Sequence, residues 1–216
     1  MLRINILTDL NSWINSWIKK FKNNLNKKGY IVLWTHEHKQ LSAGDLCFML
    51  SYEKVVGKQY LGLNSHNLVV HESSLPNGKG WSPLTWQVLE GAHTIPVTLF
   101  EAEESVDSGP IYLQEYIHLK GHELVNELRD KQAKKTIKLC NKFINNYPSI
   151  IKEAKPQIGN ETFYNRRLPS DSKLDPNKSI SEQFNLLRVV DNDSYPAFFE
   201  FKGNRYILKI EKQKQK

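Results

Sequence analysis

Short apolar runs alternate with helix-spaced apolar positions over the first two thirds of the chain. The apolar runs occupy residues 3–8, 30–34, 45–50, 68–70, 95–100 and 111–118. Runs of this length without a regular polar alternation are typical of strands buried on both faces. Between them, segments 9–27 and 123–146 carry apolar side chains three and four positions apart, the spacing of one helix face. The alternation predicts an α/β fold with a mostly parallel sheet and helices on both faces.

Capping and helix-breaking residues set the limits of the predicted helices. We expect the first helix to begin at Asp9 or Asn11 and to end at Gly29, which can adopt the left-handed conformation of a helix stop. The long helix should end before Pro148. A shorter helix should follow Ser82, with Ser82 as its N-cap and Pro83 at its first position.

The composition changes after the long helix. Residues 155–178 are rich in Pro, Asn, Asp and Ser, which predicts a mostly irregular connector. Residues 179–190 have helical spacing with Ser181 as a cap, and residues 197–210 alternate around a turn at 202–204, which predicts a β-hairpin. We therefore divide the chain into a catalytic domain at 1–152 and a C-terminal extension at 153–216, formed by the connector, the short helix and the hairpin.

The overall composition indicates a globular protein. Apolar residues make up 39% of the chain and aromatic residues 11%. No apolar run approaches the roughly 18 residues of a membrane span, and the N-terminus turns polar too early for a secretory signal. Cys47 and Cys140 are far apart and fit small buried side chains in a reducing cytoplasm. His36 and His38 lack a third ligand nearby, so we expect no metal.

The net charge of +7 raises the question of an anionic partner. Its lysines gather at positions 19–28 and 209–216. The aromatic neighbours Trp13, Trp17 and Phe21 recur at helical spacing, which places them in the core rather than on a base-stacking surface. We interpret the lysines as a solvated helix face and a terminal tail, and expect no nucleic acid partner.

Residues 67–110 contain the chemistry. His71 follows the apolar run 68–70, and open α/β sheets bind their ligands beyond the carboxyl ends of strands. Asp107 follows the run 95–100 within a turn. A histidine can take and return a proton near neutral pH, and a nearby aspartate can orient the ring and stabilise its cation. Delivered by two different strands, the pair predicts an active site.

This region resembles the signature of the folate-dependent formyltransferases. The resemblance rests on His71-x-Ser73-x-Leu75-Pro76, Lys79-Gly80, Pro83, Gly91, Val97-Thr98 and Val106-Asp107-x-Gly109. The stretches HESSLPNGKGWSP, YNRRLPSDSKLD and LLRVVDNDSYPAFFEFKGNRY are most similar to nucleotide-sugar N-formyltransferases of the pseudaminic acid type. The resemblance covers most of the chain. It implies a Rossmann-like formyltransferase fold and 10-formyltetrahydrofolate as the formyl donor.

The resemblance also implies roles for individual residues. His71 and Asp107 match the catalytic positions. Folate is expected along the loops near 52–56 and 101–107, where it would be held by Tyr52, Lys54, Val55, Leu75, Pro76, Glu103, Glu104 and Val106. Recognition of the pterin in the family is largely by main chain, so Glu103, Glu104 and Val106 are named as positions.

One position departs from the family pattern of Asn-x-His-x-Ser. Val69 occupies the place of the asparagine, whose amide is thought to donate to the formyl oxygen. Residues 67, 69 and 71 share a strand face, so a valine that cannot donate stands beside His71. We expect the donor to be protonated His71, a backbone N–H from residues 73–80 or an ordered water.

The acceptor is implied to be an amine. The favoured acceptor is a nucleotide-linked amino sugar, such as a UDP-linked 4-amino-4,6-dideoxy sugar used in surface glycan biosynthesis. Methionyl-tRNA is the first alternative, disfavoured because such enzymes carry a larger C-terminal domain. The second is a catalytically impaired RNA-binding or regulatory homologue. Candidate acceptor contacts are Ser73, Lys79, Arg166, Arg167, Arg188, Tyr195 and Phe198. A homodimer is left open.

Overall fold

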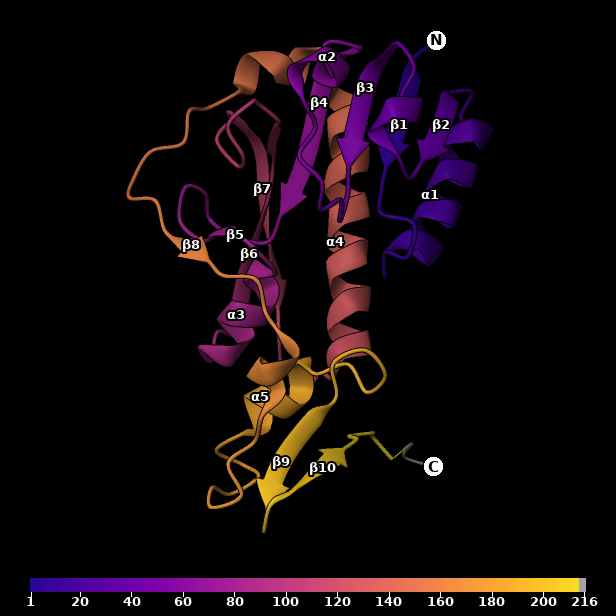
Figure 1. The fold of residues 1–216 in the computed structure, drawn as a ribbon. Helices are drawn as coiled ribbons and strands as arrows, with labels where there is room; N and C mark the ends of the chain where they lie inside the picture. Colours follow the sequence, from indigo (N-terminus) through magenta and orange to yellow (C-terminus); the bar gives the residue numbers. More distant parts are fainter. Residues whose placement is uncertain (214–216) are drawn as a thin grey trace.

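A six-stranded, mostly parallel sheet forms the centre of the computed structural model, which describes residues 1–213 (Figure 1). Its strand order is β2-β1-β3-β4-β6-β7. The first four strands run parallel, whereas β6 and β7 are antiparallel to their neighbours. The expected α/β class is therefore confirmed. The strands are β1 (Arg3–Leu7), β2 (Ile31–Thr35), β3 (Gly44–Met49), β4 (Asn64–His71), β6 (Thr94–Glu101) and β7 (Ile111–His118).

The two long helices share one face of the sheet. In α1 (Asn15–Lys27) the buried residues Ile18, Phe21 and Leu25 recur at helical spacing, and α4 (Val125–Asn146) buries a similar stripe. Both stripes pack against one core that includes Ile4 and Ile6 of β1. The opposite face carries a smaller cluster, covered by the one-turn helix α2 (Lys58–Leu61) and by loops. Both faces are covered as predicted, but unequally.

Two predicted helix starts differ from the structure. The first helix begins at Asn15 rather than at Asp9 or Asn11, because residues 9–14 form turns. Helix α3 (Pro83–Leu89) begins with Pro83 as expected, but Ser82 makes no side-chain capping bond and adopts a left-handed φ of 49°. Both departures lie beside the cavity described below, whose wall includes Trp13 and Ser82.

The C-terminal part contains the predicted helix and hairpin. Helix α5 (Phe184–Val189) starts later than predicted, and Gln183 rather than Ser181 precedes it. Strands β9 (Ala197–Phe201) and β10 (Asn204–Leu208) pair antiparallel, and the hairpin lies at the end of the molecule away from the N-terminus (Figure 1). The remaining short elements are η1 (His38–Gln40), β5 (Lys79–Gly80), η2 (Ser149–Glu153), β8 (Phe163–Tyr164) and η3 (Pro169–Ser172).

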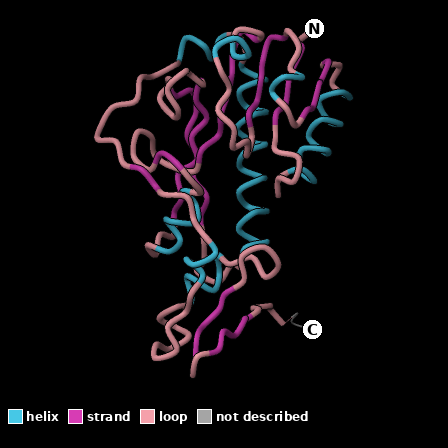
Figure 2. Tube along the Cα trace, in the orientation of Figure 1, coloured by secondary structure: helices cyan, strands magenta, loops and turns pink. Residues whose placement is uncertain are grey.

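The connector between α4 and α5 is mostly loop, as predicted, and runs back along the sheet domain (Figure 2). Its strand β8 pairs with β5, so residues 163–164 lie beside the loop that follows β4. The division at 152/153 therefore stays a prediction, since part of the extension pairs with the domain that precedes it.

The remaining composition-based expectations concern single residues and helices. Cys47 and Cys140 are buried free thiols, which confirms their interpretation as small core side chains. Burial raises the pKa of the Cys47 thiol to about 12, so it has no thiolate character near neutral pH. Within residues 1–213, no helix combines the length and the hydropathy that a membrane crossing requires.

Candidate active site

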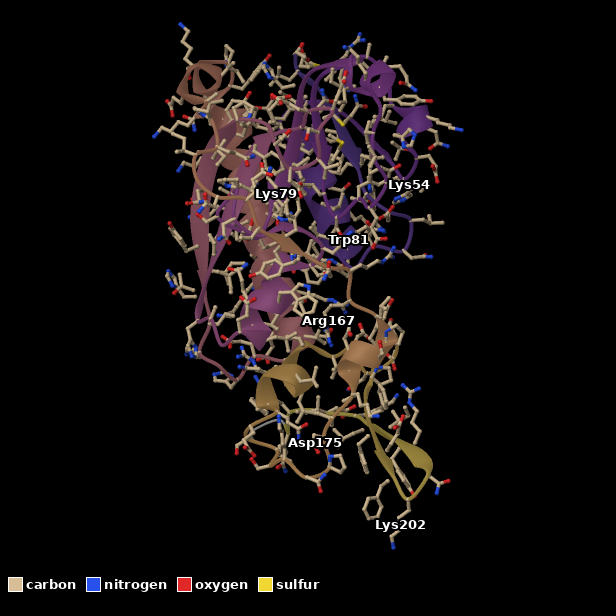
Figure 3. All side chains as sticks on the ribbon, turned by 60° about the vertical axis from the view of Figure 1, so that its left-hand side comes forward. Lys54, Lys79, Trp81, Arg167, Asp175 and Lys202 are labelled. Atoms are coloured by element: carbon tan, nitrogen blue, oxygen red, sulfur yellow. The ribbon has the colours of Figure 1, made fainter. Side chains whose placement is uncertain are left out.

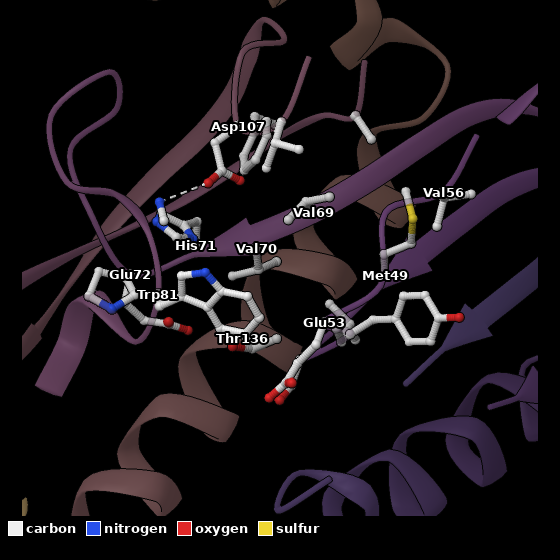
Figure 4. Close-up of a pocket in the computed structure, with 18 of the residues that line it drawn as sticks. Met49, Glu53, Val56, Val69, Val70, His71, Glu72, Trp81, Asp107 and Thr136 are labelled. Carbon is white, nitrogen blue, oxygen red and sulfur yellow. Dashed lines mark hydrogen bonds between the residues drawn. The ribbon is translucent and has the colours of Figure 1, made fainter. Parts of the chain in front are cut away.

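A cavity of about 440 Å³ opens at the carboxyl ends of the parallel strands (Figure 4). His71 is the last residue of β4, and Asp107 lies on the loop between β6 and β7. Both line this cavity, so the structure brings the two predicted catalytic residues together. This volume falls within the range of about 300–1,000 Å³ that is typical of small-molecule binding sites.

The surroundings of His71 fix its tautomer. The ring is buried, with 8% of the residue exposed, and its Nε2 lies 2.9 Å from the Gly78 carbonyl oxygen. A carbonyl oxygen can only accept, so Nε2 carries the proton. In the neutral ring, Nδ1 is then the basic nitrogen that can take a proton from a substrate.

Asp107 is held by the loop around β5 rather than by His71 itself. Its Oδ2 accepts a hydrogen bond from the Gly80 backbone N–H at 3.1 Å, the dashed line in Figure 4. His71 bonds to Gly78 of the same loop, and no direct hydrogen bond joins His71 to Asp107 among the described residues. The carboxylate is thus positioned relative to the imidazole through the segment between Gly78 and Gly80.

The turn that carries Asp107 requires a glycine two residues later. Asp107 adopts a left-handed φ of 54°. A Cβ at Gly109 would lie 2.0 Å from the Glu101 carbonyl oxygen, so no other residue fits that position without moving the turn.

The connector supports both catalytic loops. The Gln157 side-chain amide donates to the carbonyl oxygens of Asp107 and Gly109, at 3.0 and 2.9 Å. Thr162 accepts from the backbone N–H of Gly78 through its hydroxyl and from that of Lys79 through its carbonyl, at 2.8 and 2.9 Å. Residues that follow α4 in the sequence therefore fix the geometry around His71 and Asp107.

Five predicted folate-binding residues line the cavity. They come from the loop after β3 and from the β6–β7 loop: Tyr52, Lys54, Val55, Glu103 and Val106. Burial raises the pKa of the Tyr52 hydroxyl, which lies 2.8 Å from His38 Nδ1. The backbone N–H groups of residues 103–106 donate to no acceptor within residues 1–213, and so are free for a ligand.

The other three predicted folate contacts lie outside the cavity wall. Leu75 and Pro76 are buried in the loop after β4. Glu104 is exposed and pairs with Lys58 at 3.1 Å. The structure therefore places these residues behind or beside the site rather than in it.

The position of the missing asparagine has an apolar setting. Val69 lines the cavity, and its neighbours across the sheet are Met49 and Phe100. The backbone N–H groups of residues 77–80 are already used, by Ser74, Thr162 and Asp107. The oxyanion donor is thereby narrowed to protonated His71, an ordered water or an amide before Pro76.

Arg166 is the predicted acceptor contact that reaches the mouth of the cavity. Its guanidinium lies 4.5 Å from the centre of the Trp81 ring and 3.0 Å from a Glu53 carboxylate oxygen. Both partners line the cavity. Arg166 is exposed, and apart from the N–H that bonds to Glu53, its donors stay available to an anionic group.

The structure places Lys79 and Arg188, two predicted acceptor contacts, away from the cavity. The Lys79 ammonium is buried and pairs with Glu161 at 2.5 Å. The Arg188 side chain is 2% exposed and donates to the Glu123 carbonyl and carboxylate at 3.0 and 3.1 Å. Neither lines the cavity. Each cation is buried and paired with a carboxylate, Lys79 with the exposed Glu161 and Arg188 with the buried Glu123, and so lies away from the cavity proposed for the acceptor.

The remaining predicted acceptor contacts do not line the cavity either. Ser73 is buried behind the β4 end, and its hydroxyl has no partner among the described residues. Arg167 lies on the connector between Trp81 and the hairpin tip (Figure 3). Tyr195 and Phe198 belong to the hairpin region. Phe198 is buried, and the Arg205 guanidinium carbon lies 3.5 Å from the centre of its ring.

Sequence reasoning missed several residues of the cavity wall. Glu72 follows His71, and Trp81 follows β5 (Figure 4). Gln132 and Thr136 project from α4 into the same wall. The sequence did contain a feature that could have identified Gln132 and Thr136. These two polar residues are four positions apart, on the helix face that otherwise buries Ala133 and Leu139.

Comparisons with known proteins agree with this geometry. The family model described as formyl transferase matches residues 22–144, more than half of the chain. A methionyl-tRNA formyltransferase of Thermodesulfovibrio yellowstonii is 28% identical over 145 residues, covering 67% of this chain and 47% of that protein. A bifunctional polymyxin resistance protein ArnA of Wigglesworthia glossinidia brevipalpis is 28% identical over 171 residues, covering 76% and 25%. The chain thus spans about half or less of these relatives.

Solved structures share the fold. A methionyl-tRNA formyltransferase from Clostridium thermocellum matches with a TM-score of 0.80 and 20% identity, covering 99% of this chain and 94% of that one. A sugar N-formyltransferase from Shewanella matches with a TM-score of 0.71 and 12% identity over the whole of both chains. HypX from Aquifex aeolicus in complex with tetrahydrofolic acid gives 0.76 and 13%, covering 97% and 37%. At these identities the likeness shows the fold alone.

Proposed function

The chain belongs to the formyl transferase family, and from that premise we propose that it transfers a formyl group from 10-formyltetrahydrofolate to the amine of a nucleotide-linked amino sugar. The observation that carries the proposal is the meeting of His71 and Asp107, delivered by different loops, in one cavity. An imidazole and a carboxylate in a cleft of this size provide what acyl transfer to an amine requires.

The folate side of the proposal rests on the wall that holds the predicted contacts. Tyr52, Val55 and Val106 offer apolar surface, and the free N–H groups of residues 103–106 offer donors for a pterin edge. The donor would supply the formyl carbon. The chain's own part is to orient it against His71, whose Nδ1 takes a proton from the attacking amine and returns it on the leaving side.

The choice of acceptor rests on Arg166. The fold matches a sugar N-formyltransferase and a methionyl-tRNA formyltransferase over nearly the whole of each chain, so the fold match admits both acceptors. Arg166 places an exposed guanidinium beside the Trp81 ring of the cavity wall, which suits a phosphate next to a planar base. Methionyl-tRNA is the second candidate, because curated relatives such as the Thermodesulfovibrio protein carry that name.

A direct assay separates these candidates. Purified protein with 10-formyltetrahydrofolate is expected to formylate a UDP-linked 4-amino-4,6-dideoxy sugar, measured by mass spectrometry, and to leave methionyl-tRNA unchanged. Formylation of methionyl-tRNA alone would replace the sugar proposal by the tRNA one. Formylation of neither would favour the impaired RNA-binding homologue, which gel-shift titration with RNA would then test.

Restoring the family asparagine tests the oxyanion donor. In Val69→Asn we expect kcat to stay within about tenfold of the native value, because another group already supplies the hydrogen bond that is typically worth 10²–10³ in kcat. Steady-state kinetics on the formyl acceptor measure this, with Val69→Thr as the size-matched control. A rise of several orders of magnitude would show that the native site has no substitute donor.

A further inference from the structure

Glu72 is a buried carboxyl group next to His71 with no part in the proposed chemistry. It is 9% exposed and lines the 440 Å³ cavity. It also lines a second cavity of about 160 Å³, which shares Trp13, Glu72, Ser82 and Gln132 with the first. Glu72 thus lies in the wall between the main cavity and this second cavity, which we call the side chamber, one residue from the catalytic imidazole.

Glu72 lacks a cationic partner. Within residues 1–213 it forms no ion pair, although Arg129 lines the side chamber. That guanidinium is already bound to Asp191 at 2.7 Å. Burial raises the pKa of the Glu72 carboxyl, and the neighbouring His71 and the Gln132 amide only partly oppose this. A buried carboxylate without a cation is costly, so the site favours a ligand that brings one.

We propose that Glu72 is the receptor for the protonated amine of the acceptor and takes its proton before the amine attacks. The inference rests on the proposed function and assigns its acceptor end. The acceptor must arrive as a primary ammonium, the form that dominates at neutral pH, and this form has no lone pair for attack.

The proton transfer is balanced within the cavity. One N–H bond of the ammonium breaks, and its proton passes to a Glu72 carboxylate oxygen. The amine keeps the electron pair and becomes a neutral nucleophile beside His71. Glu72 returns the proton to water when the product leaves. His71 Nδ1 therefore remains free for the later proton transfer.

The side chamber gives the acceptor room beside its amine. A volume of 160 Å³ is about five times the roughly 30 Å³ share of one water molecule, enough for a small substituent of the acceptor ring. Its walls combine Leu84, Val125 and Leu128 with Thr85. A methyl or acetamido group next to the amine matches this mixture of apolar surface and the hydroxyl groups of Thr85 and Ser82.

The charged groups that face Glu72 set its pH dependence. These are His71 on the same strand end, Asp107 across the main cavity and Arg129 on α4. Recognition of an ammonium needs an ionised Glu72 and a protonated amine. The preference for an amine should therefore fade as the pH falls towards the raised pKa of Glu72, and again as it rises through that of the amine.

Binding titrations test the proposal without turnover. The probes are a UDP-linked 4-amino-4,6-dideoxy sugar and its 4-hydroxy counterpart, titrated by calorimetry in the presence of tetrahydrofolate. The native protein is expected to bind the amine about tenfold or more tightly than the hydroxyl compound, as a charge-assisted hydrogen bond allows. Glu72→Gln should reduce this preference to within about threefold, and should lower kcat/KM about 10²-fold. Glu153→Gln, an exposed carboxylate outside both cavities, is the charge-matched control.

The outcomes separate the two proposals. An unchanged amine preference in Glu72→Gln, or no preference in the native protein, overturns the role of Glu72 whether or not formyl transfer occurs. Loss of the preference without any formyl transfer by the native protein supports Glu72 and rejects the proposed function. Tetrahydrofolate affinity shows whether the variant is folded. If it is not, the pH series on the native protein decides, since a preference that stays constant as the pH is lowered also overturns the proposal.

Discussion

His71→Asn is expected to lower kcat for formyl transfer by about 10²–10⁴-fold while tetrahydrofolate binding stays near its native value. Asparagine is too short to replace the Nε2 bond to the Gly78 carbonyl oxygen, but Thr162 still bonds to the backbone N–H groups of Gly78 and Lys79, so the loop keeps that support. What disappears is the basic Nδ1, the atom that receives the proton in the proposed reaction. The loss should therefore lie in kcat rather than in binding of either substrate.

His118→Asn is the matched control. His118 is exposed at the end of β7 and lies outside the cavity, so its replacement should leave the kinetics unchanged. Rapid-quench measurement of a single turnover separates the chemical step from product release. A native single-turnover rate in His71→Asn would remove His71 from the chemistry and leave the cavity without its proton acceptor.

Arg188→Met should lower the free energy of unfolding by about 1–3 kcal/mol, because it removes the two buried hydrogen bonds that Arg188 donates to Glu123, while the Lys131 ammonium and the Lys120 backbone N–H still bind the carboxylate. Arg188 and Glu123 are 2% and 3% exposed at the side chain, and they join α5 to the start of α4. Chemical denaturation measures the change. Arg3→Met, at the exposed first position of β1, should change the free energy of unfolding by no more than about 0.5 kcal/mol.

Glu123 also predicts how stability changes with pH. Burial works to raise the pKa of Glu123, but the Lys120 backbone N–H and the Lys131 ammonium outweigh it and lower the pKa to about 2. A lowered carboxyl pKa contributes stability above the unfolded value near 4.5, and this contribution is lost as the pH falls towards 2.

If Arg188→Met instead weakened acceptor binding in a fully folded protein, Arg188 would be an acceptor contact after all.

The sheet could be predicted from the sequence because its strands are continuous apolar runs. The run 111–118 matches β7 residue for residue, and most other strands shift by one or two positions. The start of α1 was harder, since Trp13 and Ile14 continue the helical spacing although residues 9–14 turn. Those side chains line the cavity and also contact the main core, so apolar spacing continues through residues that precede the helix.

The site was predictable where a residue's chain position decided its place. His71 at a strand end and Asp107 in the turn after another strand were found in this way. The buried position of Arg188 could not be predicted in this way. A basic residue on a short helix is expected at the surface unless its distant partner, here Glu123, is known. The place of Gln132 in the cavity wall was missed for the same reason, because its neighbour Glu72 lies 60 positions earlier in the sequence and on another element.

The connector's hold on the catalytic loops limits how this protein can be recombined with its relatives. Three residues that follow α4 in the sequence, Gln157, Thr162 and Tyr164, form hydrogen bonds with the turn that carries Asp107 and with the loop beside His71. A chimera joined at the end of the long helix would import these supports from a foreign parent. A crossover placed after Arg166 would exchange η3, α5 and the hairpin, and would leave the supports of the reaction centre native.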